Sequence, residues 1–402
     1  MQHIVIDQPY RFIPPCRGNF WPCLLKPFLP GYLRRTQGVA AVELRGTERL
    51  RQSLAAGHGV MLTPNHCRPA DPMVVMQLGY AVGRPVHTMA SWHLFKQSAL
   101  QAWVLRRMGV FSVYREGLDR EALKCAAQIL VASKRPLVLF PEGVLSRTND
   151  QVHHLMEGTV FIARTAAKQR AASGVPGKIV IHPVAIRYHF EGHLEETLAR
   201  ALAQIERRLA WQPQAHLDLP ERIIKVGYAL LTLKEIEYLG APQTGSLAQR
   251  LTTLIDHLLD PIEVEWLKGK RNDPVVTRVK NLRFAILPDM ISGVLDASER
   301  ARRWRQLADI YLAQQLFFYP PGYFSPAPTP ERLLETVERF EENLTDKDPV
   351  HGPLRAVLEV GEAIEVSPTR DRGAETDPVM TRIRTQLEKM LAQRRSDLIR
   401  TT

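Results

Sequence analysis

The segment Thr63-Pro64-Asn65-His66-Cys67-Arg68-Pro69-Ala70-Asp71-Pro72 joins an apolar run at 59–62 to a helical pattern that begins at Pro72. This arrangement is typical of a strand, a loop and a helix in succession. The loop carries an imidazole, His66, and a carboxylate, Asp71. A carboxylate can orient an imidazole and stabilise its charged form, so the pair is predicted to act as a general base with its orienting acid. The same spacing also arises by chance, and the neighbouring motifs must support the interpretation.

Three further apolar runs follow, and two of them lead into charged side chains that could act on a substrate. The run at 136–140 leads into Phe140-Pro141-Glu142-Gly143-Val144-Leu145-Ser146-Arg147, the run at 110–114 delivers Arg115, and a fourth run spans 179–186. Helical patterns lie between these runs, and Asp119 is placed to cap one of them. Alternation of this kind predicts an α/β fold: a mixed, largely parallel sheet flanked by helices, followed by a mostly helical C-terminal extension. The motifs at the strand ends would then converge on one edge of the sheet.

The order and spacing of these four blocks, over about 42–226, resemble the phospholipid/glycerol acyltransferase family, which includes lysophosphatidic acid acyltransferases and glycerol-3-phosphate acyltransferases. The resemblance implies an enzyme of membrane phospholipid synthesis. It would transfer a fatty acyl group from acyl-CoA or acyl carrier protein to the hydroxyl of a lysophospholipid, with lysophosphatidic acid as the leading acceptor. No cofactor and no metal are expected, because the acyl donor is a co-substrate.

The resemblance also assigns roles to residues. His66 and Asp71 match the family's catalytic dyad, Arg115 matches an arginine thought to contact the acceptor's phosphate, and Glu142 is expected to position the acceptor. With these assignments and the arginines nearby in the same motifs, the residues predicted to bind substrate are Asn65, Arg68, Arg115, Glu142, Gly143 and Arg147. Backbone amides around 65–68 or at Gly143 are expected to stabilise the oxyanion.

This sequence departs from the family pattern at three positions. Val144 and Leu145 replace a threonine and a phosphate-holding arginine, and Arg68 stands where many members have serine. Either other arginines compensate for Leu145, or the acceptor carries no phosphate there and is a neutral hydroxyl or amine compound. A third possibility is a catalytically inactive lipid-binding protein on the same fold, against which the intact dyad counts.

Composition narrows the range of partners. The formal net charge is +11, which favours an anionic partner. The sequence has no zinc spacing, recognition-helix signature or aromatic nucleic-acid-binding strand, so no nucleic-acid partner is expected. A membrane surface, the phosphates of coenzyme A or an acidic carrier protein fit better. Four cysteines without paired spacing indicate a reducing compartment.

The N-terminal segment 12–35 interleaves aromatic and leucyl residues with Lys26, Arg34 and Arg35. Such a segment suits the headgroup interface of a membrane, although it could simply pack on the catalytic domain. No signal peptide and no transmembrane helix are expected. The predicted location is therefore peripheral, on the cytoplasmic face of a membrane.

Three regions are predicted: a membrane-docking arm at 1–36, an acyltransferase domain at 37–262 and an accessory C-terminal region of unknown function at 263–402. Within them, 195–209 reads as a charged helix and 223–230 as a strand. Residues 354–366 repeat the local pattern of that strand, so the chain contains either a partial duplication or a long insertion that displaces the true strand.

Overall fold

The computed structural model describes residues 5–271, 274–319, 322–323, 328–370, 373 and 376–392. These residues form two compact units. Of the described residues, those within 11–114, 118–191 and 352–392 make the α/β unit, and those within 5–10, 115–117 and 192–351 make the helical unit.

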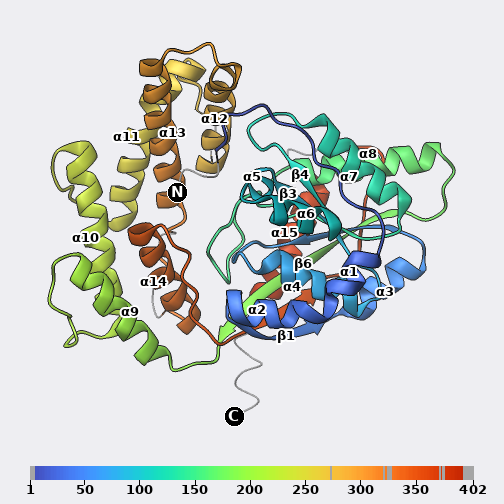
Figure 1. Ribbon diagram of the computed structural model, residues 1–402, viewed down its shortest axis with the longest axis horizontal. Coiled ribbons are helices and arrows are strands. Elements are labelled where there is room, and N and C mark those ends of the chain that lie inside the picture. The colour runs from blue at the N-terminus through green and yellow to red at the C-terminus, as the bar shows by residue number, and fades with distance from the viewer. Residues whose placement is uncertain are drawn as a thin grey trace. The chain divides into compact units, whose positions relative to one another are not determined.

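The α/β unit begins with short helices and then alternates strands with helices (Figure 1). Its elements are α1 (Phe20–Leu25), the 3-10 helix η2 (Lys26–Phe28), α2 (Leu29–Gln37), β1 (Val39–Arg45), α3 (Thr47–Ala55), β2 (Gly59–Pro64), α4 (Asp71–Ala81), β3 (His87–Ser91), α5 (His93–Lys96), α6 (Ala99–Arg107), β4 (Val110–Val113), α7 (Arg120–Ala132), β5 (Leu137–Val138), α8 (Gly158–Ala172), β6 (Ile179–Phe190), β7 (Leu354–Val360), β8 (Ile364–Glu365) and α15 (Pro378–Ala392). The predicted cap of α7 is confirmed, because Asp119 accepts a hydrogen bond from the backbone N–H of Ala122.

The strands form one eight-stranded sheet in the order β1-β7-β6-β2-β5-β3-β4, with β8 also paired to β6. All neighbours are parallel except β6 with β7 and β6 with β8. Every residue of β2 is buried, as expected for a central strand covered on both faces. Side chains of α7, α8 and α15 join this core. The predicted fold class, a mixed and largely parallel sheet flanked by helices with a helical region later in the chain, is confirmed.

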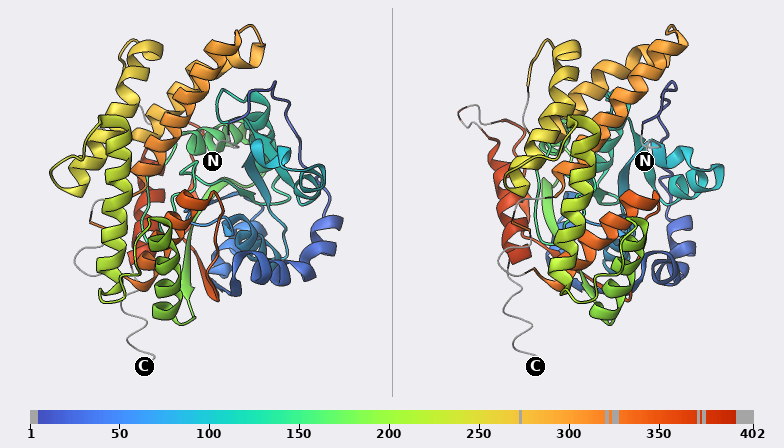
Figure 2. Two further views of the ribbon diagram at one scale, coloured as in Figure 1. Left: turned by 60° about the vertical axis from the view of Figure 1, so that its left-hand side comes forward. Right: turned by 90° about the vertical axis from the view of Figure 1, so that its left-hand side faces the viewer.

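The helical unit contains α9 (Leu194–Arg208), α10 (Leu219–Leu239), α11 (Leu247–Leu267), α12 (Val275–Ser292), α13 (Ala297–Phe317) and α14 (Pro330–Thr345), coloured green to orange in Figure 2. A buried core joins α11, α12 and α13 to the end of α10. The predicted helix at 195–209 corresponds to α9.

A repeated ion pair connects successive helices of this unit. The fourth residue of α10, of α11 and of α12 is a buried arginine whose Nε and Nη2 bond both oxygens of a buried glutamate in the preceding helix. The three pairs are Arg222 with Glu206, Arg250 with Glu235, and Arg278 with Glu263. We call these pairs the arginine–glutamate staples. Their even spacing marks a helical repeat that the sequence analysis missed.

The predicted strand at 223–230 is wrong, because these residues lie inside α10. Asp218 and Glu221 form a capping box at the start of this helix, and Gly240 ends it in the left-handed conformation. The apolar run between these caps is compatible with a buried strand or a buried helix, and periodicity alone does not separate the two. The two caps identify this run as a helix.

This correction settles the choice between duplication and insertion. The run at 354–366 does form strands, β7 and β8, and β7 pairs antiparallel with β6, so that Phe190 lies opposite Leu354. The helical unit is therefore inserted between two neighbouring strands of one sheet. The division into compact units does not follow the expected boundaries at 36/37 and 262/263, since 192–262 group with the helices and 352–392 with the sheet.

Candidate active site

The predicted dyad is formed at the end of β2. His66 Nδ1 lies 2.8 Å from Asp71 Oδ2, and the imidazole stacks on Phe140 with ring centroids 4.2 Å apart. Asp71, the first residue of α4, is fully buried, whereas the His66 side chain keeps 19% of its surface exposed. With Nδ1 bonded to the carboxylate, Nε2 is the nitrogen that can take a proton from a substrate.

Asp71 is fixed by several donors. Its Oδ2 accepts the backbone N–H groups of Cys67 at 2.7 Å and Arg68 at 2.9 Å, while its Oδ1 accepts the Tyr188 hydroxyl at 2.6 Å. Burial, together with the charge of Asp71, raises the pKa of Tyr188 well above its usual range, so the phenol stays protonated and donates. A carboxylate held by this many donors has one orientation in which to present Oδ2 to the imidazole.

Tyr188 reaches Asp71 because β6 continues past the end of β2. The pairing of β2 with β6 stops at Pro64 and Val184. Beyond that point two asparagine side chains take the place of a strand: Asn65 bonds the backbone N–H and C=O of Ile186, and Asn149 bonds those of Tyr188. The predicted substrate contact of Asn65 stays a prediction, and its observed contacts hold the loop of His66 against β6.

Glu142 holds the backbone of the same loop from the other side. It is buried, and its carboxylate accepts the N–H of His66 at 2.9 Å and that of His153 at 3.3 Å. Burial raises the pKa of Glu142 to about 8, against the lowering effect of these two N–H groups. Ser146 completes the support, because its N–H and hydroxyl both donate to the carbonyl of His66. Glu142 is thus placed to position the base, and its expected contact with the acceptor stays a prediction.

Gly143 occupies a position that other residues would not tolerate. Its φ of +68° is left-handed, and a Cβ there would lie 2.2 Å from Met156 Sδ. The glycine makes the sharp turn after Pro141 possible and thereby aims Glu142 inward.

Four of the five amides expected to stabilise the oxyanion already donate within the protein. The amides of His66, Cys67 and Arg68 donate to Glu142 and Asp71, and that of Gly143 donates to the carbonyl of Phe140. The structure therefore differs from the prediction that these amides face the reacting carbonyl. The sequence spacing predicted that these amides lie near His66. It could not show that they donate to groups that hold the loop of His66 in place.

The three arginines expected to bind substrate lie in different surroundings. Arg68 is buried, and its guanidinium lies 5.5 Å from the centre of the Tyr188 ring, beside the dyad. Arg147 is half-buried with a positive φ in the loop after Glu142. Arg115 follows β4 by two residues but groups with the helical unit. Their substrate contacts stay predictions.

Sequence reasoning missed Tyr188, Asn149 and Ser146. Each supports the dyad, its loop or the strand beside it through a hydrogen bond between segments distant in the chain, and no local sequence motif marks these residues. The available signal was the length of β6, whose residues past the end of β2 had to meet the loop of His66.

The N-terminal arm packs on the α/β unit and also leaves apolar side chains exposed. The Trp21 ring meets the Trp103 ring of α6 edge to face, 4.8 Å between centroids, with Arg107 beside both. On the same short helices Phe20 and Phe28 are 68% and 69% exposed. Leu24 and Tyr32 are exposed as well. Among the described helices, none combines the length and the apolar character that crossing a bilayer requires.

Residues 41–187 match the family model described as Acyltransferase. The match runs from β1 to within three residues of the end of β6 and stops before the inserted helical unit. These residues are therefore similar to the Acyltransferase family, which confirms the resemblance seen in the sequence. A search of curated proteins found no match.

Proposed function

We propose that this acyltransferase-family protein moves a fatty acyl group from a thioester donor, acyl-CoA or acyl carrier protein, to the hydroxyl of a lysophospholipid, with lysophosphatidic acid as the leading acceptor. The family match supports acyl transfer to a hydroxyl. The observation that carries the mechanism is the 2.8 Å contact between His66 and the buried Asp71.

In the proposed reaction, His66 Nε2 takes the proton of the acceptor hydroxyl as its oxygen attacks the thioester carbonyl. The carbon–sulfur bond then breaks, and the imidazolium returns the proton to the departing thiolate. Asp71 stabilises the charged imidazolium between these two steps. The products are an ester and a free thiol, so neither a cofactor nor a redox partner is needed.

The decisive assay incubates the purified full chain with labelled acyl-CoA or acyl carrier protein and a panel of lysolipids. His66→Ala should lower turnover by roughly 10²- to 10⁴-fold, since a general base is lost, and Asp71→Asn should cost less but still a large factor. Cys67→Ala is the matched control, because it removes the neighbouring thiol but keeps the N–H that bonds Asp71. An inactive Cys67→Ala with an active His66→Ala would replace this mechanism with a covalent one.

A second candidate is acylation of an acceptor without phosphate, and Leu145 is the residue that favours it. A guanidinium grips phosphate through paired charge-assisted hydrogen bonds, whereas leucine offers only apolar surface. The same panel decides between the two, because a neutral acceptor used better than lysophosphatidic acid would select the second candidate.

We further propose that the protein works on a membrane surface, on the cytoplasmic face. The exposed aromatic and leucyl side chains of the arm and the positive net charge support this location.

A further inference from the structure

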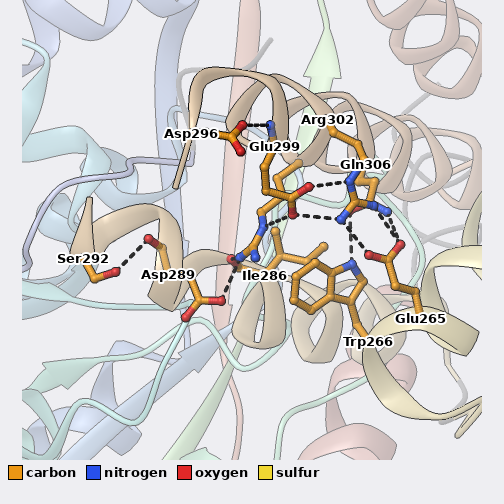
Figure 3. Close-up of polar contacts among 10 residues, drawn as sticks. Glu265, Trp266, Ile286, Asp289, Ser292, Asp296, Glu299, Arg302 and Gln306 are labelled. Atoms are coloured by element: carbon orange, nitrogen blue, oxygen red, sulfur yellow. Dashed lines mark hydrogen bonds and ion pairs between the residues drawn. The ribbon is translucent and has the colours of Figure 1, made fainter. Parts of the chain in front are cut away.

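The helical unit contains a buried arginine, Arg283, whose surroundings differ from those of the arginines in the staples. Arg222, Arg250 and Arg278 each present the Nε–Nη2 edge of the guanidinium to a glutamate. Arg303 bonds Glu299 through Nε and bonds Asp289 and the carbonyl of Ile286 through Nη1. Figure 3 shows these three partners.

Arg283 in α12 is 6% exposed, and among the described residues neither its Nε nor its Nη2 has a hydrogen-bond partner. These two atoms form the edge that the staples use for two oxygens of one carboxylate. Burying a cation without such a partner is costly. The edge therefore has the shape and charge to accept two oxygens of an external anion.

The two earlier copies of the helical repeat carry no charge at the position of Arg283. Arg283 is the ninth residue of α12, and the ninth residues of α10 and α11 are Gly227 and the buried Ile255. In α12, the third copy of the repeat, a charged residue thus occupies a position that is uncharged in α10 and α11.

A second arginine adds to the positive charge at this place. The segment 115–117, which groups with the helical unit, carries Arg115. Burial, together with the nearby charge of Arg115, lowers the pKa of Arg283 to about 10, while Glu116 and Tyr311 act in the opposite direction. With two guanidinium groups and one carboxylate, the surroundings carry a net positive charge at neutral pH.

We infer that Arg283 and Arg115 form an anion-binding site for a phosphate group. The inference deepens the proposed function, on which it rests for the identity of the substrate: the phosphate belongs to the lysophospholipid acceptor or to coenzyme A.

The first test measures phosphate binding without any acyl transfer. Thermal unfolding of the full chain is followed in inorganic phosphate and in potassium chloride of equal ionic strength. Phosphate should raise the unfolding midpoint of the wild type and leave the midpoint of Arg283→Ile unchanged. The variant Arg283→Ile should still fold, because it copies Ile255 of the preceding repeat. Arg283→Lys, which keeps the charge but loses the fork, should respond weakly.

The control is Arg305→Gln, which removes an exposed arginine of α13 and should respond like the wild type. An equal rise of the midpoint in wild type and Arg283→Ile would overturn the site. Because this test needs no substrate, its result stands even if no lysolipid proves to be an acceptor.

The second test shows which substrate carries the phosphate that Arg283 binds. Losing a charge-assisted fork should raise KM about 10- to 100-fold for the ligand concerned. In Arg283→Ile a higher KM for lysophosphatidic acid, with KM for acyl-CoA unchanged, assigns the acceptor's phosphate. A higher KM for acyl-CoA, with that for acyl-pantetheine unchanged, assigns the donor's phosphate. If no KM changes, the assignment to a substrate is wrong.

Discussion

At the scale of single residues, the candidate site is a base whose surroundings leave it little freedom. His66 is held by its side chain through Asp71 and by its backbone through Glu142 and Ser146. A base held in one geometry loses less entropy when the acceptor hydroxyl arrives, and small displacements of its support should therefore reduce the rate.

Tyr188 provides the sharpest test of this support. Tyr188→Phe removes one hydrogen bond from Asp71 and little volume, so we expect kcat/KM to fall about tenfold, the usual cost of one hydrogen bond to a charged group. Without the phenol, the carboxylate interacts more strongly with the imidazolium, and the acidic limb of the pH profile should move to higher pH. Profiles of kcat/KM between about pH 5 and 8 check this, with the melting temperature as control. An unchanged profile with normal activity would show that Tyr188 only fills space.

Glu142 should make the stability of the protein depend on pH. Its pKa is raised to about 8 in the folded protein, so the folded state binds a proton that the unfolded state has released. The stability due to this proton is present below the ordinary glutamate pKa and is lost as pH rises towards 8. Glu142→Gln should remove this dependence, by up to about 1.4 kcal/mol per pH unit.

Urea unfolding of both proteins at intervals from about pH 5 to 8.5 measures the effect. The wild type should lose stability relative to Glu142→Gln across that window. If the free energies of unfolding of the two proteins change in parallel with pH, Glu142 does not titrate within this pH window.

At the scale of elements, the arginine–glutamate staples should dominate the stability of the inserted helices. Glu235 is fully buried and bonds Arg250 at 2.8 and 2.6 Å. Arg250→Leu strands this carboxylate and should cost about 3–5 kcal/mol, whereas the double variant Arg250→Leu with Glu235→Leu should cost clearly less. A double-mutant cycle by urea denaturation measures the coupling. The exposed pair Arg200 and Glu196 in α9 is the control and should contribute less than about 1 kcal/mol.

The elements also show what sequence could and could not predict. The alternation of strand-like runs with helical patterns, supported by the cap at Asp119, predicted the sheet. It also predicted that His66, Asp71 and Glu142 lie at the ends of strands. The strand predicted at 223–230 failed because the run alone fits both states and the capping pair Asp218 and Glu221 was not weighed. Tyr188 and Arg283 were missed because their importance depends on what surrounds them in three dimensions.

At the scale of the whole molecule, the stretch that matches the family model is followed by an insertion that the model does not cover. The match ends at residue 187, and the chain returns to the sheet at Leu354, opposite Phe190. Because an antiparallel pair can be joined by a loop of almost any length, the insertion leaves the pairing of β6 with β7 intact. Function can be added to the domain at this point without disturbing the dyad.

The whole protein must also reach its lipid substrates, and the last prediction concerns how it does so. Phe20, Leu24 and Phe28 are exposed on the arm, while Trp21 packs on Trp103. The variant Phe20→Ser, Leu24→Ser, Phe28→Ser should therefore weaken binding to anionic liposomes at least about tenfold at every salt concentration, since each side chain loses apolar surface that the bilayer would bury.

Sedimentation with anionic phosphatidylglycerol-containing vesicles measures this binding, and the wild type should be partly released by high salt because exposed charges are screened within about 10 Å at 0.1 M. The matched control replaces Val264, Phe284 and Val294, three exposed apolar residues of the helical unit, with serine and should bind like the wild type. If the arm variant also binds like the wild type, the arm is only a packed segment of the α/β unit. If the control loses binding instead, the helical unit is the part that meets the membrane.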